Sequence, residues 1–476
     1  MLNQLTRRKP LPSVASGPPS GAGLLRNITL FQLTLMGVST TLGTGIFFVL
    51  AETVPIAGPA VILAFVLAGL TAGFSALCYA EVSSQLPVSG SSYTFAYMTM
   101  GEGVAIVVVS CLLLEWGIAG AATAVGWSQY LEDLSHIAFG VDIPDVIQHA
   151  PLALAPDTGE WVWNQESYIN LPAVILIWLC AALLLRGSHE SALVNAILAT
   201  IKLSILALFV VLTLTAFDRG NFSPFMPHGI SGVGAAASIV FFSFIGLDAI
   251  VNASEETINP SRNIPRAIIG ALIVVTGFYA LIAASSLGVQ PAQDFVGHSG
   301  SLTMVLQRAT GAPWLSGVLA AGAVVSIFSV TLICLYSQSR ILLALARDGF
   351  VPQRLGKIHP KTHSPSRAIL LTASILTPLA GFLPSSLLLS MVSLGTLLAF
   401  SSVAISLMIL RSRFKVDRGG YRTPVYPLIP MMSLLSCGYL ISQMNPNAFR
   451  VFSVWLGLVV VFYLLYGRKH ASLGAV

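Results

Sequence analysis

The chain has 476 residues, of which 55% are hydrophobic and only 9% are charged. Soluble domains carry about 25% charged residues, so this composition excludes an ordinary water-soluble protein and indicates a chain embedded in a lipid bilayer. The net charge of +5 is therefore no sign of nucleic-acid binding, and its distribution reports membrane topology instead.

The N-terminal segment is polar and proline-rich to about residue 26 and carries the basic cluster Arg7, Arg8 and Lys9. No short apolar core with a small-residue cleavage site precedes the first long apolar run, so we expect no cleaved signal peptide. We expect residues 1–26 to form a disordered cytoplasmic tail.

Apolar runs long enough to span a bilayer then recur twelve times. Their expected limits are 28–55, 58–84, 101–130, 168–186, 191–217, 232–256, 264–289, 313–346, 366–383, 386–411, 425–444 and 448–467. The pattern predicts an all-α polytopic membrane protein with twelve transmembrane helices. The five cysteines fall singly within these runs and are typical of small core residues rather than of disulfides or metal ligands.

The basic residues sort to one side of the membrane. With the N-terminus inside, 20 of the 24 Lys and Arg residues lie on the inner side, Lys202 lies within the membrane, and only Arg219, Arg308 and Arg450 lie outside. Because Lys and Arg accumulate on the cytoplasmic side, we expect a multi-pass protein of the cell membrane with both termini in the cytoplasm.

The first and sixth runs contain helix-breaking residues. Gly43 and Gly45 stand one residue apart in the first run, and Gly246 precedes Asp248 in the sixth. Broken helices in corresponding positions indicate a transporter built from inverted repeats, although small residues in one run alone also suit close helix packing. We therefore expect repeats at 27–217 (helices 1–5) and 218–411 (helices 6–10), with helices 11 and 12 in 412–476.

Four of the unusual residues fall at a similar depth. At a rise of 1.5 Å per residue, Gly43 lies about 22 Å into the first helix, Gly246 about 21 Å into the sixth, Glu115 about 21 Å into the third and Lys202 about 16 Å into the fifth. All four lie near the bilayer midplane, where transporter binding sites lie.

The ends of the half-helices suit the two charged groups of an amino acid. Free amides at a helix N-terminus attract anions, and free carbonyls at a C-terminus attract cations. We expect the amides of Thr44 and Gly45 to bind a carboxylate and the carbonyls beside Gly246 to bind an ammonium group. The expected substrate-binding residues are Thr41, Leu42, Gly43, Thr44 and Gly45 in the first break and Phe242, Ser243 and Ile245 in the second.

Lys202 lies in a run with no other charge within eleven residues on either side. Burial favours the uncharged form of a lysine, so Lys202 suits the exchange of a coupling proton. The alternative is a fixed ion pair with Glu115 or Asp248.

Glu115 either pairs with Lys202 or presents its carboxylate to a cationic substrate side chain, and the sequence leaves both open. Asp248, Ser326 and Ser329 are further candidates for lining the site. The two serines share a helix face, but serines in membrane helices also bond their own backbone.

Several motifs resemble the amino acid–polyamine–organocation superfamily, and specifically its bacterial cationic amino acid transporter type. The motifs are Leu42-Gly-Thr-Gly-Ile-Phe47, Ala57-Gly-Pro-Ala60, Leu77-Cys-Tyr-Ala-Glu81, Gly90-Ser-Ser-Tyr93, Ala124-Val-Gly-Trp127, Phe242-Ser-Phe-Ile-Gly-Leu-Asp248, Glu255-Glu-Thr-Ile-Asn-Pro260, Ser337-Gln-Ser-Arg340 and Arg347-Asp-Gly349.

The resemblance implies the five-plus-five inverted repeat of the leucine-transporter-type fold, with discontinuous helices 1 and 6. It implies carboxylate binding at Gly43 to Gly45, amine binding at Phe242, Ser243 and Ile245, and a proton-coupled lysine, here Lys202. Two departures are the polar approach Ser39-Thr-Thr41 and Phe328, where a smaller polar residue is expected.

Other function classes fit poorly. All eight histidines fall in expected loops or tails and no metalloprotease or serine-hydrolase motif is present, so we expect no enzyme, no metal and no cofactor other than coupling protons. We expect secondary active uptake of cationic amino acids such as arginine, lysine or ornithine by alternating access, with small neutral amino acids or exchange as the alternative. The expected partners are the amino-acid substrate and the lipid bilayer, without nucleic acid or an obligate protein partner.

Overall fold

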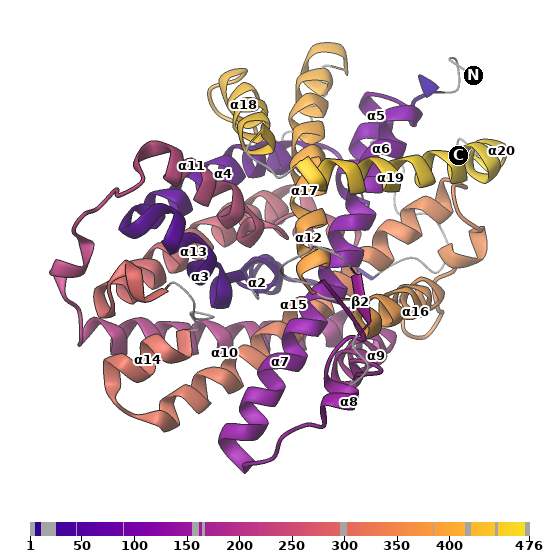
Figure 1. Cartoon of the computed structure of the whole chain (residues 1–476). Helices are drawn as coiled ribbons and strands as arrows, with labels where there is room; N and C mark the ends of the chain where they lie inside the picture. Colours follow the sequence, from indigo (N-terminus) through magenta and orange to yellow (C-terminus); the bar gives the residue numbers. More distant parts are fainter. Residues whose placement is uncertain are drawn as a thin grey trace.

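The computed structural model describes residues 5–10, 25–43, 45–88, 90–154, 161–163, 167–295, 302–383, 385–414, 420–442 and 446–471. These residues are almost entirely helical. In Figure 1 long helices surround two short ones near the middle of the molecule, α2 (Leu30–Thr41) and α3 (Gly45–Ala57).

The helices follow one another along the chain in the order that the apolar runs predict. The main ones after α3 are α4 (Val61–Gln85), α6 (Glu102–Leu113), α7 (Ala119–Phe139), α9 (Leu171–Arg186), α10 (Ser188–Leu214), α11 (Gly229–Val240), α12 (Ala249–Asn252), α13 (Pro260–Val289), α15 (Pro313–Arg347), α16 (Ser366–Phe382), α17 (Ser385–Ile409), α18 (Leu428–Ser442) and α19 (Pro446–Phe462). The predicted all-helical class is therefore confirmed.

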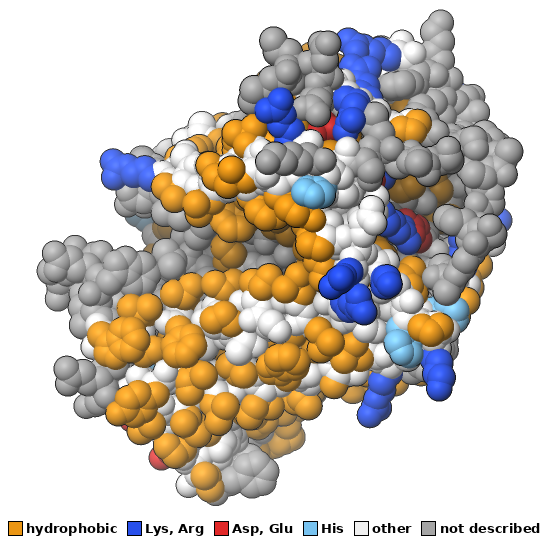
Figure 2. All heavy atoms as spheres, turned by 90° about the vertical axis from the view of Figure 1, so that its right-hand side faces the viewer, with side chains coloured by type: hydrophobic (Ala, Val, Ile, Leu, Met, Phe, Trp, Pro, Cys, Tyr) orange, Lys and Arg blue, Asp and Glu red, His pale blue; other side chains and the backbone are white. Residues whose placement is uncertain are grey.

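Six helical segments of the described chain are long and apolar enough to cross a membrane. They are Thr53–Gln85, Glu102–Glu132, Ala192–Leu214, Pro260–Val289, Gly317–Arg347 and Val392–Arg413, and shorter apolar helices accompany them. In Figure 2 broad hydrophobic areas cover much of the visible surface, and basic side chains gather toward its top and right. Exposed apolar area of this extent suits a polytopic membrane protein, because lipid rather than water surrounds it.

The first predicted break is present. Helix α2 begins with a capping box in which Thr29 and Gln32 each bond the other's backbone N–H, at 3.3 and 3.0 Å. It ends at Thr41, and a new helix begins at Gly45. Thr44, predicted to bind substrate, lies outside the described residues.

The second predicted break is also present, between α11 and the single turn α12. Phe241–Phe244 form a 3₁₀ turn, and Gly246 follows with φ +110°. A Cβ atom at Gly246 would lie 2.4 Å from Cγ2 of Thr40. Only glycine meets both conditions, the left-handed backbone and the close approach of the first break. The two breaks therefore pack directly against each other.

The expectation of a disordered N-terminal tail is wrong for residues 5–10. The Arg7 guanidinium lies 3.1 Å from the carboxylate of Glu102, Lys9 pairs with Asp348, and the Lys9 backbone N–H donates to Tyr97 O at 3.2 Å. The reason is electrostatic, because the basic residues meet two buried carboxylates that favour cationic partners. Residues 1–4 and 11–24 lie outside the described part.

Two expected loops contain further structure. The connection after α4 folds into the fully buried helix α5 (Ser91–Thr99). In the expected loop 131–167, α7 continues to Phe139, and α8 (Asp145–Gln148) and an antiparallel hairpin of β1 (Leu152–Leu154) and β2 (Trp161–Trp163) follow. These elements are polar or short and lack the long apolar run on which the sequence prediction depended.

Substitution of Gly246 tests the packing of the two breaks. Gly246→Ala should lower the free energy of unfolding by about 2–4 kcal/mol, because it combines left-handed strain with a steric clash. Gly277→Ala in α13 is the matched control, since its added methyl group meets open space. It should leave stability unchanged or raise it by up to about 1 kcal/mol. Thermal unfolding of the purified variants measures both, and equal melting temperatures would refute this account of Gly246.

Candidate functional site

A small cavity lies between the two helix breaks. It is lined by Thr40, Thr41 and Gly43 of the first break, Ser243 and Ile245 of the second, Trp116, Ala119 and Thr123 of the helical segment Glu102–Glu132, and Val330 and Cys334 of α15. The centre of a water molecule can move through only about 30 Å³ of it. Four of the predicted substrate-binding residues therefore line one cavity.

The other predicted residues of the breaks do not line this cavity with described side chains. Leu42 is fully buried, and its carbonyl faces Lys202. Gly45 begins α3, so its amide lies at a helix N-terminus as expected. Phe242 lies in the 3₁₀ turn, and only its backbone belongs to the described structure.

Tyr279 of α13 joins the two breaks and was missed by the sequence prediction. Its hydroxyl oxygen lies 2.5 Å from Thr41 O and 2.7 Å from Ser243 O. One hydroxyl proton can be donated to only one of these carbonyls at a time. Tyr279 lies in an ordinary apolar run, so no sequence signal distinguishes it from a core aromatic residue.

Most hydroxyl and amide groups around the cavity already have partners. The hydroxyls of Thr40 and Thr41 donate to carbonyls one turn earlier in α2, at 2.6 and 2.9 Å. The Gly43 N–H donates to Thr41 O at 2.7 Å. The Ser243 hydroxyl has no hydrogen-bond partner among the described residues. Ser243 is thus a polar group available to a ligand.

Lys202 lies at the end of α2 rather than beside a carboxylate. Its ammonium nitrogen, in a side chain only 1% exposed, lies 2.7 Å from Ser39 O and 2.6 Å from Leu42 O. Carbonyls at a helix C-terminus carry partial negative charge and attract cations. The alternative of a fixed pair with Glu115 is wrong for this structure, because neither oxygen of Glu115 has a hydrogen-bond partner in the described part of the chain.

The two predicted serines of α15 lie around this lysine site. Ser326 Oγ donates to Leu42 O at 3.4 Å, and Ser329 Oγ accepts from Ser39 Oγ at 2.7 Å. Ser329 in turn donates to Ser326 O at 2.6 Å. The serines thus connect α15 to the backbone that Lys202 binds, and neither lines the cavity.

Glu115 and Asp248 are buried outside the cavity lining. Glu115 lies in a π-helical turn, Leu114–Ile118, an irregularity that frequently marks functional sites. Neither carboxylate is among the residues that line the cavity. Contact between Glu115 and a substrate side chain stays a prediction.

A cavity between two broken helices, with a buried lysine on the freed carbonyls of one of them, is the arrangement of a membrane carrier. A family model described as amino acid permease matches residues 28–466. The chain belongs to the amino acid permease family.

Curated relatives of this permease span nearly its whole length. It is 35% identical to the methylthioribose transporter and 36% identical to the branched-chain amino acid permease BcaP, both of Bacillus subtilis, over 99% of this chain and 100% of each relative. It is 34% identical to the vacuolar cationic amino acid transporter 2 of Arabidopsis thaliana over 86% of this chain and 63% of that protein. These relatives are carriers, not enzymes.

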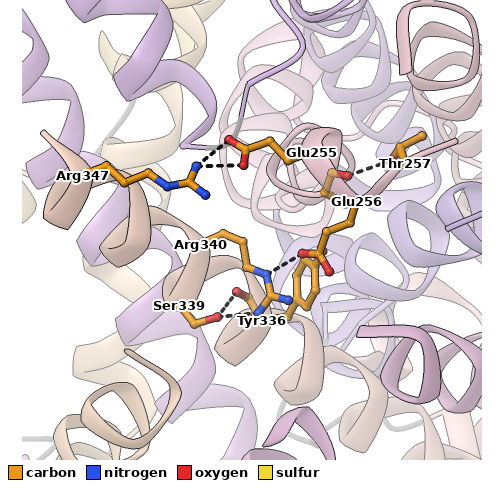
Figure 3. A network of polar contacts seen from close by, with 8 residues as sticks. Glu255, Glu256, Thr257, Tyr336, Ser339, Arg340 and Arg347 are labelled. Carbon is orange, nitrogen blue, oxygen red and sulfur yellow. Dashed lines mark hydrogen bonds and ion pairs between the residues drawn. The ribbon is translucent and has the colours of Figure 1, made fainter. Parts of the chain in front are cut away.

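An ion-pair network joins α15 to the segment that follows α12 (Figure 3). Arg340 Nε lies 2.8 Å from Glu256 Oε1, and both side chains are almost fully buried. The Tyr336 hydroxyl donates to the same oxygen at 2.8 Å, and the Arg340 guanidinium lies 3.8 Å from the Tyr336 ring centre. A second, more exposed pair joins Arg347 to Glu255 at 2.8 Å.

Backbone hydrogen bonds join the same segment to the start of α2. The N–H groups of Asn27 and Ile28 both donate to Glu256 O at 3.0 Å, and Ile258 N–H donates to Ile28 O at 3.0 Å. The entrance to α2 and the segment after α12 are therefore one unit, which the two arginines hold against α15.

Substitution of Arg340 and of Arg347 compares the buried ion pair with the exposed one. Arg340→Ala should cost about 3–5 kcal/mol of stability, because it leaves the buried Glu256 charge without a partner. Arg347→Ala removes an exposed pair and should cost about 1 kcal/mol or less. Thermal unfolding of the purified permease measures both losses.

A double variant separates loss of the pair from loss of arginine packing. Arg340→Ala with Glu256→Gln should recover part of the loss, since the unpaired charge is gone. Equal melting temperatures for the two single arginine variants would contradict the buried role of Arg340.

Proposed function

We propose that this permease takes up neutral amino acids with small or apolar side chains, coupled to protons, by alternating access around the cavity. The observation that carries the proposal is the cavity lining, which contains no charged side chain among the described residues. A cationic side chain placed there would lose its water without gaining a counter-charge, which is strongly unfavourable.

The helix breaks supply partners for the main-chain groups of such a substrate. The N-terminus of α3 at Gly45 suits the carboxylate. The carbonyls of Phe242, Ser243 and Ile245 suit the ammonium group. The unpartnered hydroxyl of Ser243 adds a further hydrogen bond.

The side chain of the substrate would lie against the helical segment Glu102–Glu132 and α15. Ala119 and Val330 offer apolar surface, Thr123 and Cys334 are small, and Trp116 forms a broad apolar wall. This lining favours the alternative of the sequence analysis over its first expectation of arginine, lysine or ornithine.

Cationic amino acids are the second candidate. The observation that favours them is Glu115, which lies one residue from the cavity-lining Trp116 and whose oxygens have no partner in the described structure. A rotation of the π-helical turn would be needed to bring this carboxylate to the cavity. Similarity to the Arabidopsis cationic amino acid transporter is consistent with this candidate.

Lys202 is the proposed proton-coupling group. When charged, it forms charge-assisted hydrogen bonds to Ser39 O and Leu42 O, which are stronger than bonds between neutral groups. Loss of its proton would weaken the attachment of α10 to the end of α2. Proton binding and the position of the first break are thereby linked.

We also propose the finer topology. The order of helices and the paired breaks suit twelve crossings, in which the first five and the next five form inverted repeats of the leucine-transporter-type fold. The concentration of Lys and Arg in alternate connections suits cytoplasmic termini in the cell membrane. The end of the molecule that contains the Arg340–Glu256 ion pair would then face the cytoplasm.

Uptake by purified permease in proteoliposomes tests the substrate class. Labelled leucine should accumulate under an inward proton gradient and stop accumulating when the gradient is dissipated, whereas labelled arginine should enter at least about tenfold more slowly. Accumulation of arginine without leucine would overturn the neutral assignment in favour of the cationic one. Uptake that ignores the gradient but needs internal amino acid would show an exchanger.

The proton-coupling role of Lys202 has its own test. Lys202→Ala should lose gradient-driven accumulation of substrate, because no group remains to exchange a proton at the end of α2. Lys357→Ala, on an exposed loop, is the control and should behave like the unmodified permease. Full accumulation by Lys202→Ala under the same gradient would show that Lys202 does not couple protons.

A further inference from the structure

Tyr279 of α13 holds the two helix breaks together from outside the cavity. Its side chain is fully buried, and it is not among the residues that line the cavity. Its hydroxyl oxygen lies 2.5 Å from Thr41 O and 2.7 Å from Ser243 O, and both of these residues do line the cavity. A single hydroxyl group therefore lies between carbonyls of the first and second breaks.

Aromatic packing fixes the position of this hydroxyl. The ring centres of Tyr279 and Phe65 of α4 are 5.4 Å apart, and Tyr279 meets the Phe244 ring edge to face at 5.2 Å. Phe244 belongs to the 3₁₀ turn of the second break, and α13 packs against both α2 and α4. The hydroxyl cannot move away without disturbing these close-packed contacts, so it is a rigid link between the two carbonyls.

The hydroxyl and Gly246 limit the separation of the breaks in opposite directions. A Cβ atom at Gly246 would lie 2.4 Å from Cγ2 of Thr40, so the breaks are already packed there and cannot come closer. The hydrogen bond from Tyr279 opposes their moving apart, because a buried carbonyl that loses its donor is costly. Together the two contacts fix the spacing of the breaks.

This spacing matters because the proposed function divides one substrate between the breaks. The carboxylate is assigned to the helix N-terminus at Gly45 and the ammonium group to carbonyls of the second break, Ser243 among them. Thr41 O also accepts the N–H of Gly43 at 2.7 Å, two residues before α3 begins. Tyr279 therefore connects the segment that carries the carboxylate subsite to a carbonyl of the ammonium subsite.

The link leaves room for the substrate's own hydrogen bonds. A carbonyl oxygen has two lone pairs, so Ser243 O can accept the Tyr279 hydroxyl proton and still bind an ammonium group. The hydroxyl has a single proton and can donate to only one of its two carbonyls at a time. An ammonium group in the cavity can supply a proton to the other one.

We propose that Tyr279 is a specificity-determining residue, which selects α-amino acids over β-amino acids by fixing the spacing of the two breaks. An α-amino acid has one carbon atom between its two charged groups, whereas a β-amino acid has two. Tyr279 acts through the carbonyls of Thr41 and Ser243 rather than by contact with the substrate, so it is a positioning residue. The inference rests on the proposed uptake of amino acids at the cavity.

Competition on the unmodified permease is the first test and needs no variant. Unlabelled leucine and unlabelled β-leucine, the isomer with its amino group one carbon farther from the carboxylate, compete for uptake of labelled leucine into proteoliposomes. β-Leucine should need a concentration at least about tenfold higher for half-inhibition, because its ammonium group loses a charge-assisted hydrogen bond to the second break. Equal competition by the two isomers would overturn the proposal.

Tyr279→Phe removes the hydroxyl and keeps the ring. The preference for leucine over β-leucine should fall by at least about threefold, the effect of losing one neutral hydrogen bond. This preference is a ratio measured within one preparation, so a general loss of folded protein does not change it. An unchanged preference would overturn the proposal.

Tyr79→Phe is the matched control. Tyr79 is also buried and packs against Phe95 and Phe400, but its hydroxyl has no hydrogen-bond partner in the described part of the chain. The variant should keep the preference of the unmodified permease. An equal fall in both variants would show that the effect does not come from the link between the breaks.

Tyr279→4-aminophenylalanine separates hydrogen bonding from packing. The new amino group is uncharged at neutral pH and carries two N–H donors, so it can bond both carbonyls at once. This variant should retain the preference that Tyr279→Phe loses. Loss of the preference in both variants would mean that hydrogen bonding at this position does not set the spacing, and would overturn the proposal.

The result can be separated from that of the proposed function. If the permease accumulates arginine and not leucine, the neutral assignment fails, and arginine with its β-amino isomer replaces the leucine pair in the same comparison. Leucine uptake with an unchanged preference in Tyr279→Phe would overturn only the role of Tyr279. Uptake of no α-amino acid by the unmodified permease would overturn both proposals.

Discussion

Backbone groups freed at the two helix breaks have no water to bind inside a bilayer, and the surrounding structure is built to supply their partners. Lys202 binds the carbonyls of Ser39 and Leu42, and the Tyr279 hydroxyl lies between carbonyls of both breaks. Because Gly246 has no side chain, the second break can pack directly against the first. These partners bond backbone carbonyls of the breaks without filling the cavity between them.

Charge is distributed in this permease by the same requirement for partners. Glu102 and Asp348 form ion pairs with Arg7 and Lys9. These two pairs hold residues 5–10 against the rest of the protein. Glu115 and Asp248 are also deeply buried, yet neither forms an ion pair with a basic residue of the described chain.

Much of the fold follows from the sequence alone. The length of each apolar run predicts a helix, and glycines within two of these runs predict breaks, because both signals are local. Lys202 is also conspicuous in the sequence, because a cation within an apolar run is costly to place in a membrane. The short helix α5 and the ordered segment 5–10 were not predicted, because their stability comes from contacts with distant residues such as Glu102 and Asp348.

The sequence by itself determined the class of protein, the order of its helices, the two breaks and the candidate residues around them. Only the tertiary structure decided which of the buried charges meet. Lys202 and Glu115 lie at similar calculated depths, yet the lysine binds carbonyls and Glu115 has no hydrogen-bond partner among the described residues. The physical reason is that depth along a helix is set by residue number, whereas the direction of a side chain is set by how helices turn and pack. Glu115 lies in the π-helical turn Leu114–Ile118 and does not line the cavity, although its neighbour Trp116 does.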